Sequence, residues 1–191
     1  MNLALIRKHI AKATTLHRAF NLAIAVALGI ALSTPSLASG VKIDELIVGT
    51  SVPRGHEAPT VKAAREFYEF WNSGDDAVLK QAISPSFTDR TLPPGRPQGP
   101  QGPAFASHQF RAAVPDLRVE VKKMIVAGDY ITVHMVFTGH FTGAFGQVQG
   151  KGQSIAFIAT DLLKVTEGRI TDNWHIEDNL SLMKQLGVVP Q

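Results

Sequence analysis

The sequence predicts an α+β domain, in which helices gather on one face of a curved antiparallel sheet and enclose a cone-shaped pocket. Segments with apolar residues at helical spacing come first along the chain, and four long segments with alternating apolar residues follow them. Glycine-containing turns join these four segments. Helices followed by a run of antiparallel strands are typical of the α+β class. The 191 residues include no cysteine, so packing alone must stabilise the domain and thiol chemistry is excluded.

The start of the chain has the three-part layout of a secretory signal. Four basic residues precede the apolar stretch AFNLAIAVALGIAL, and the small residues Ser36 and Ala38 predict cleavage after Ala38. We therefore interpret residues 1–38 as a signal peptide and expect an exported protein, periplasmic or secreted, with no membrane partner after cleavage. A retained leader would instead anchor it.

Removal of the leader also changes the charge of the chain. Its four basic residues leave 15 of the original 19, against 16 acidic residues, which gives a net charge of −1. No stripe of lysine and arginine remains, so we expect no nucleic-acid partner. Neither a Walker loop nor a GxGxxG after a strand is present, which argues against nucleotide-cofactor folds.

The mature chain divides into an arm and a domain. Residues 39–58 mix glycine, proline and charge without a sustained period, and they predict an extended N-terminal arm. Residues 59–191 form the domain, which opens with a helix whose apolar positions recur at helical spacing until the sequence NSG ends it.

Two more helices are predicted on either side of a long loop. DDAVLKQAI is a second short helix, and GPAFASHQFRAAV is a third that ends before Pro115. Between them, SFTDRTLPPGRPQGPQGPAF contains too much proline and glycine for regular structure over much of its length. Long loops inside compact domains are often lids or binding loops.

The second half of the chain predicts the sheet and a closing helix. A pattern with period two is typical of strands with one buried face. The short helix NLSLMKQLG follows the last strand. The predicted strands cover residues 117–128, 129–141, 153–165 and 169–177.

The last hairpin predicts a polar pair on an apolar face. If residues 166–168 form a three-residue loop with Gly168 at positive φ, Val165 pairs with Arg169. Asp161 then faces Asn173, and His175 lies one diagonal step away on the same face. A carboxylate near a histidine on an apolar wall is an orienter-and-base arrangement.

Other polar residues near this pair have structural interpretations. Asp172 and Trp174 lie on the opposite face, where Asp172 is predicted to be a surface or interface group. Glu177 and Asp178 stand at the start of the last helix, where both are predicted to serve structure and Asp178 can be the N-cap. No HxH or HxxxH pair supports a metal site.

Four segments together resemble the SnoaL-like polyketide cyclases, or ester cyclase group, of the NTF2-like superfamily. These are FYEFWNSGD, GPAFASHQFRAAVPDLRVEV, GDYITVHMVFTGHFTGAFG and DLLKVTEGRITDNWHIEDNLSLMKQLG, within roughly residues 60–188. The resemblance implies the NTF2-like cone, a pocket for a small hydrophobic molecule, and neither metal nor cofactor. It also implies ring closure by intramolecular aldol condensation, with a catalytic carboxylate on the last strand and a histidine on the preceding strand.

The sequence departs from the cyclase pattern at the candidate site. Counted from Gly168, the catalytic Asp of the cyclases falls on His175 and their pocket His falls on Asp161, so the two residue types have changed places. We expect His175 to remove a proton next to a carbonyl group, and Asp161 to orient its ring. Further candidate substrate-binding residues are Asp89, Asn173, Phe157, Trp71 and Phe67, of which Asp89 (if protonated) or Asn173 would steady the oxyanion.

Three readings of function remain open. The first is cofactor-independent acid/base chemistry, such as cyclisation or isomerisation, on a small hydrophobic carbonyl compound. The second is a non-catalytic binding or carrier protein with the same pocket, in which Asp161 and His175 only fix the strand register. The third is a protein whose sheet serves association, and we expect a homo-oligomer, dimer or tetramer. Export argues against a role inside a cytoplasmic polyketide pathway.

Overall fold

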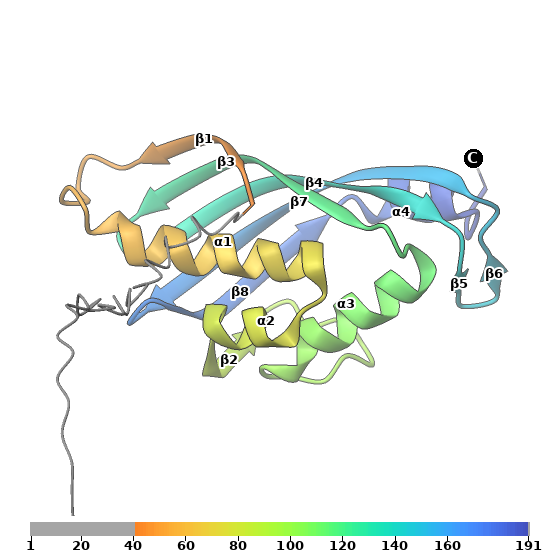
Figure 1. The fold of residues 1–191 in the computed structure, drawn as a ribbon, viewed down its shortest axis with the longest axis horizontal. Coiled ribbons are helices and arrows are strands. Elements are labelled where there is room, and N and C mark those ends of the chain that lie inside the picture. Colours follow the sequence, from red (N-terminus) through yellow and green to blue (C-terminus); the bar gives the residue numbers. More distant parts are fainter. Residues whose placement is uncertain (1–40, 191) are drawn as a thin grey trace, which may run out of the picture. The chain divides into compact units, whose positions relative to one another are not determined.

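The computed structural model describes residues 41–190, which form a six-stranded sheet, a two-stranded hairpin and four helices (Figure 1). The predicted α+β class is confirmed. The predicted signal peptide and its cleavage site lie outside the described residues. In chain order the elements are β1 Ile43–Val48, α1 Glu57–Ser73, α2 Asp76–Ala82, β2 Ile83–Asp89, α3 Gln101–Ala113, β3 Arg118–Ala127, β4 Tyr130–Phe141, β5 Ala144–Phe145, β6 Val148–Gln149, β7 Gln153–Thr166, β8 Arg169–Glu177 and α4 Asn179–Leu186.

The main sheet has the order β1-β3-β4-β7-β8-β2, with α1, α2 and α3 below it in the view of Figure 1. The four predicted long strands are β3, β4, β7 and β8, and they pair antiparallel as expected. Their alternating residues on one face form the core with Phe67, Tyr68 and Phe70 of α1, which are at most 2% exposed. The helices therefore bury one face of the sheet and leave the other outside.

Two further strands extend the sheet at its edges, and both run parallel to their neighbours. β1 lies within residues 39–58, so the expected arm is in part a strand paired with β3. Its four middle residues are all exposed, which explains why it lacks an alternating pattern. β2 pairs with β8 and places Asp89 beside Asn173 at the start of the long loop.

The turn between β7 and β8 differs from the predicted one. Glu167 and Gly168 both have positive φ, 52° and 72°, and form a two-residue turn that pairs Thr166 with Arg169. Thr171 then stands unpaired in a β-bulge, which shifts the register by one more residue. As a result Asp161 and His175 are direct cross-strand partners, where the sequence predicts a diagonal pair.

The end of β4 meets the end of α3 at Gly143. The backbone N–H groups of Thr142 and Gly143 both donate to the Ala113 carbonyl oxygen, at 3.1 and 2.9 Å. A Cβ atom on Gly143 would lie 1.9 Å from the Ala112 carbonyl oxygen. Only glycine permits this approach, which holds α3 over the sheet.

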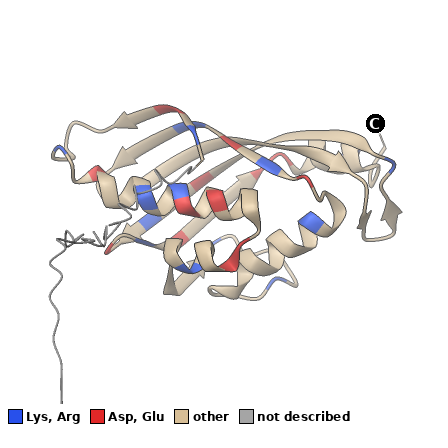
Figure 2. Cartoon of the chain, viewed as in Figure 1, with Lys and Arg blue, Asp and Glu red and all other residues tan. Residues whose placement is uncertain are grey.

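Charged residues of both signs are spread along α1 and the sheet (Figure 2). Several form exposed pairs, including Lys123 with Glu45 at 3.0 Å and Lys122 with Asp44 at 3.3 Å, which join β3 to β1. Exposed pairs of this kind each contribute about 0–1 kcal/mol. Within residues 41–190, no helix is both long and apolar enough to span a bilayer.

Candidate functional site

A cavity of about 450 Å³ lies between the sheet, the helices and the loop after β2. This volume is within the usual range for small-molecule pockets, roughly 300–1,000 Å³. All seven candidate residues named from the sequence line it. Its aromatic lining comprises Phe67, Trp71, Phe87, Phe105, Phe110, Phe137, Phe145 and Phe157, and its charged or amide lining includes Asp89, Arg96, Gln109, Asp161, Asn173, His175, Glu177 and Asn179.

Aromatic rings form one continuous wall of the cavity. Phe137 and Phe157 are stacked, with centroids 5.1 Å apart and an interplanar angle of 10°. Trp71 forms a T-shaped contact with Phe137, with ring centroids 5.7 Å apart, and Phe110 forms one with Phe157 at 6.0 Å. Aromatic groups in such arrangements bury large areas and are rigid. This wall suits a flat hydrophobic ligand.

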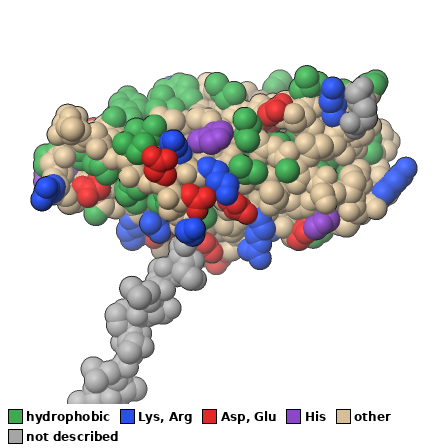
Figure 3. All heavy atoms as spheres, turned by 90° about the horizontal axis from the view of Figure 1, so that it is seen from above, with side chains coloured by type: hydrophobic (Ala, Val, Ile, Leu, Met, Phe, Trp, Pro, Cys, Tyr) green, Lys and Arg blue, Asp and Glu red, His purple; other side chains and the backbone are tan. Residues whose placement is uncertain are grey.

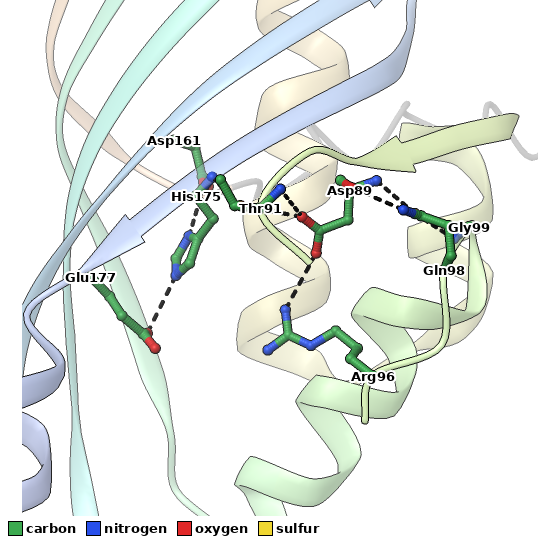
Figure 4. Close-up of polar contacts among 8 residues, drawn as sticks. All are labelled: Asp89, Thr91, Arg96, Gln98, Gly99, Asp161, His175 and Glu177. Atoms are coloured by element: carbon green, nitrogen blue, oxygen red, sulfur yellow. Dashed lines mark hydrogen bonds and ion pairs between the residues drawn. The ribbon is translucent and has the colours of Figure 1, made fainter. Parts of the chain in front are cut away.

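The loop after β2 is fastened next to the cavity (Figure 4). The Gln98 side chain accepts from the Asp89 backbone N–H at 2.8 Å and donates to the Asp89 carbonyl oxygen at 2.9 Å. The Asp89 carboxylate accepts from the N–H and hydroxyl of Thr91 at 2.9 and 3.2 Å, and Arg96 lies 3.6 Å away. Asp89 thus acts as an acceptor beside a cation. The expected role of a protonated Asp89 as a donor to an oxyanion does not fit these contacts.

Asp161 and His175 form the centre of the polar part of the cavity. The Asp161 side chain is 3% exposed, and its Oδ1 lies 2.7 Å from Nδ1 of His175. Its Oδ2 accepts a hydrogen bond from the Tyr68 hydroxyl at 2.8 Å. Sequence reasoning places Tyr68 only on the apolar face of the first helix, although a buried hydroxyl there needs a partner. The structure therefore adds Tyr68 to the predicted pair.

The groups around His175 raise the pKa of its ring. Burial acts to lower the pKa of the ring, but the charge and hydrogen bond of Asp161, with a smaller contribution from Glu177, raise the pKa from 6.5 to about 10. His175 is therefore an imidazolium at neutral pH. Burial and the neighbouring Asp161 carboxylate also raise the pKa of Tyr68, which stays protonated.

Glu177 belongs to the cavity, which corrects its predicted structural role. Its Oε2 lies 3.3 Å from Nε2 of His175 (Figure 4), and the two side chains are 27% and 26% exposed. The signal for this placement is the spacing of two residues on one strand, which puts both side chains on one face. Asp178 has the predicted role, because its carboxylate accepts from the Ser181 N–H at 3.0 Å and caps α4.

A family model described as SnoaL-like polyketide cyclase matches residues 61–186. The chain belongs to this family. This membership indicates a cyclase-type or isomerase-type protein that binds small molecules. A search of curated proteins finds no match.

Solved structures of similar proteins agree with this membership. A protein described as a polyketide cyclase from Bacillus cereus is 37% identical, with a TM-score of 0.72 over 80% of this chain and 97% of that one. IdmH from Streptomyces antibioticus, also described as a polyketide cyclase, is 27% identical, with a TM-score of 0.61 over 68% of this chain and 98% of that one. A Catenulispora acidiphila protein with a ketosteroid isomerase-like fold, 19% identical at a TM-score of 0.52 over 66% and 92% of the two chains, supports the NTF2-like fold alone.

The carboxylate and the histidine of the candidate pair lie on facing strands. Asp161 of β7 and His175 of β8 are direct cross-strand partners. The charged ring therefore lies on the strand that also carries Glu177.

Asn173 lies on the same face of β8 and is 8% exposed. Its Oδ1 has no hydrogen-bond partner within the described part of the chain, although it is buried. A buried amide oxygen without a partner is costly. A ligand that donates a hydrogen bond could satisfy it.

Asp172 lies on the outer face as expected, but it is buried there and not a plain surface group. It is 8% exposed and pairs with Arg90, whose Nε lies 2.7 Å from Oδ1. Burial acts to raise its pKa, but the hydrogen bonds from Thr171 and Arg90 lower it. The Arg90 guanidinium also lies 6.0 Å from the centroid of Trp174. This contact fastens β2 to β8 outside the cavity.

No three His, Asp or Glu side chains between residues 41 and 190 converge in a way that could hold a metal ion. Two other strand histidines have partners outside the cavity. Nδ1 of His134 lies 3.0 Å from the Thr160 hydroxyl, and Nδ1 of His140 lies 2.6 Å from Asp116.

Proposed function

We propose that this family member is an exported enzyme that binds a small hydrophobic carbonyl compound and moves a proton on it, as in cyclisation or isomerisation. The observation that supports this most is the charged pair Asp161–His175 within an aromatic cavity. Apolar pockets with a few convergent polar groups and perturbed pKa values are typical of active sites. The chemistry needs neither metal nor cofactor, because side chains alone carry the proton.

His175 is the proton donor in this proposal, which replaces its expected role as a base. With a pKa of about 10, its ring already carries both protons at neutral pH. Nδ1–H is held by Asp161, so Nε2–H is the group left to bind a carbonyl oxygen. As negative charge develops on that oxygen, the imidazolium stabilises it. Tyr68 holds Asp161 in place from the other side.

The aromatic wall supports the hydrophobic character of the ligand. Phe137, Phe157 and Trp71 offer flat, mostly apolar surfaces that line the cavity. Export, if the leader acts as its layout predicts, would separate this chain from a cytoplasmic polyketide pathway. We therefore propose a substrate met outside the cytoplasm.

The experiment that tests this function uses α-tetralone, a ketone with exchangeable hydrogens next to its carbonyl group. Exchange of these hydrogens in D₂O is followed by NMR for the wild type, His175→Gln, Asp161→Asn and the double variant. Loss of acid assistance should lower the rate by about 10²–10⁴-fold in His175→Gln. The double variant should lose less than the two single losses combined, because the residues act as a unit. His134→Gln, outside the cavity, is the matched control.

The alternative is a binding or carrier protein without turnover, and one observation favours it. Both oxygens of Asp161 have partners, as expected for a pair that only fixes the register of β7 and β8. In that case the variants would lower the melting temperature, and the wild type would bind α-tetralone without accelerating exchange.

We also propose that the protein is a homo-oligomer, dimer or tetramer, through the outer face of the sheet. Hydrophobic side chains appear among polar ones on the face seen in Figure 3. Apolar residues of β3, β7 and β8 alternate outward there, and a second copy of the same face could bury them. Light scattering of the wild type and of Leu162→Lys should show loss of the oligomer. The exposed residues are Ile125 (38%), Ile158 (49%), Leu162 (38%) and Ile176 (74%).

A further inference from the structure

We propose that Glu177 is the group that takes the substrate proton, with His175 as the donor opposite it. This assignment rests on the acid–base function proposed above and supplies its missing half. An imidazolium donor polarises a carbonyl group, but a second group must accept the proton from carbon. The cavity has three carboxylates that could do so within the described residues: Asp89, Asp161 and Glu177.

The contacts of these carboxylates distinguish them. Asp161 is 3% exposed and both of its oxygens are bonded, to Tyr68 and to His175. Asp89 has a side chain 8% exposed, accepts from Thr91 and lies beside the Arg96 cation. Each of these two is buried, and its oxygens lie against other groups of the protein, which limits its access to a ligand.

Glu177 is different in both respects. Its side chain is 27% exposed, and among residues 41–190 its side chain has one polar contact, to His175 Nε2 at 3.3 Å. Charge-assisted hydrogen bonds between nitrogen and a carboxylate are usually about 2.7–2.9 Å long. The contact is thus loose, and a ligand can separate the two groups. Because Glu177 and His175 are two residues apart on β8, both then face the same bound molecule.

The proton transfer balances with these two side chains. The Glu177 carboxylate takes a hydrogen from the carbon next to the carbonyl group. The electron pair of that C–H bond forms a C=C bond, and the carbonyl π pair moves to oxygen, which receives the Nε2 proton of His175. In an isomerisation, Glu177 returns its proton to another carbon while the enol returns its proton to His175. In a cyclisation, the enol carbon attacks a second carbonyl group, whose oxygen takes the proton from Glu177, while the enol O–H proton returns to His175 as the first carbonyl re-forms.

The assignment predicts the pH dependence of the rate. The groups that face Glu177 and His175 are Asp161 of β7 and Tyr68 of α1, with Asp89 and Arg96 across the cavity. The reaction needs the carboxylate of Glu177 and the imidazolium of His175 together, so the rate profile has an acidic and a basic limb, and the basic limb follows the loss of the His175 proton at a pKa of about 10. If His175 were the base, the rate would instead keep rising through the pH range where its ring becomes neutral.

The test uses 5-nitrobenzisoxazole, a flat aromatic probe whose ring opens when a base removes its C–H proton and a coloured phenolate forms. Wild type should accelerate this reaction with the pH profile above. Glu177→Gln should lose roughly 10²-fold or more of the rate and the acidic limb of the profile. The quenching of tryptophan fluorescence, to which Trp71 in the cavity wall contributes, should show unchanged binding. Glu177→Asp, which withdraws the carboxylate by one methylene, should be intermediate. Glu120→Gln, on the outer face of β3, is the matched control for charge.

Each outcome decides between the proposals. Turnover by the wild type that persists in Glu177→Gln overturns this assignment and leaves the acid–base function in place. A wild type that binds the probe without turnover overturns both. Loss of the acidic limb together with the rate in Glu177→Gln, at unchanged melting temperature and binding, supports the assignment, because a purely structural role would not move the pH profile.

Discussion

The charged His175 should make the stability of the fold depend on pH in a defined direction. In the unfolded chain its pKa is the ordinary 6.5, and in the folded protein it is about 10. Between these values the folded state binds one more proton than the unfolded state, so stability falls as pH rises, by about 1.4 kcal/mol per pH unit. The contribution is fully present below pH 6.5 and is lost as pH passes through about 10. Its upper limit is roughly 5 kcal/mol.

Urea unfolding of the wild type and of His175→Gln at intervals from pH 6.5 to 9.5 measures this effect. The difference between the two free energies of unfolding should shrink steadily across this range. His134→Gln is the control, because its ring lies on the outer face of the sheet and hydrogen-bonds the Thr160 hydroxyl, away from Asp161 and Glu177. The upper bound of pH 9.5 keeps Tyr68 mostly protonated, since its ordinary pKa is 10.0 and its folded pKa is raised. A difference that stays constant with pH would refute the ion pair and the donor role built on it.

Three further predictions concern other parts of the chain. Tyr68→Phe leaves one oxygen of the buried Asp161 without its donor and should lower the free energy of unfolding by about 1–3 kcal/mol. Tyr130→Phe, at an exposed residue, should change this free energy little. Equal effects of the two substitutions in chemical denaturation would contradict the contact between Tyr68 and Asp161. Gly143→Ala should destabilise by at least about 1–3 kcal/mol, because the added Cβ meets backbone, and an unchanged melting temperature would argue against that packing. Intact mass from the exporting cell should place the mature N-terminus at Ser39, and a retained leader would reverse the proposed localisation.

The extents of the central strands could be predicted because each has one buried face, and alternation is a local signal. β1 could not, since its middle residues are exposed and backbone bonds to β3 hold it in place. The register of the last hairpin depends on the bulge at Thr171, and no residue type in the sequence predicts that bulge. Alternation still places Asp161 and His175 on one face, because the shorter turn and the bulge together shift the pairing by two residues, which keeps each side chain on its face.

The missing parts of the site are those that depend on contacts between distant elements. Tyr68 looks like another core aromatic in its helix, and only the packing of α1 on β7 shows that its hydroxyl reaches Asp161. Glu177 precedes the helix cap Asp178, and this position suggests a structural role. In the structure β8 extends to Glu177, and the Glu177 side chain points into the cavity. The pKa of His175 likewise depends on how many carboxylates surround it, which spacing alone does not reveal.

The parallel pairing of the edge strands constrains the order in which the domain can form. β2 precedes its neighbour β8 by most of the domain, with partners as far apart as Ile83 and Ile170. β1 likewise can form its backbone hydrogen bonds only when its later partner β3 is present. Closing such long loops costs conformational entropy, which is offset only when the contacts of the completed sheet form. The cavity is therefore complete only when the final strand lies between β7 and β2 and places His175 and Glu177 in it. A chain that emerges from a ribosome has no complete site until nearly all of it has passed through.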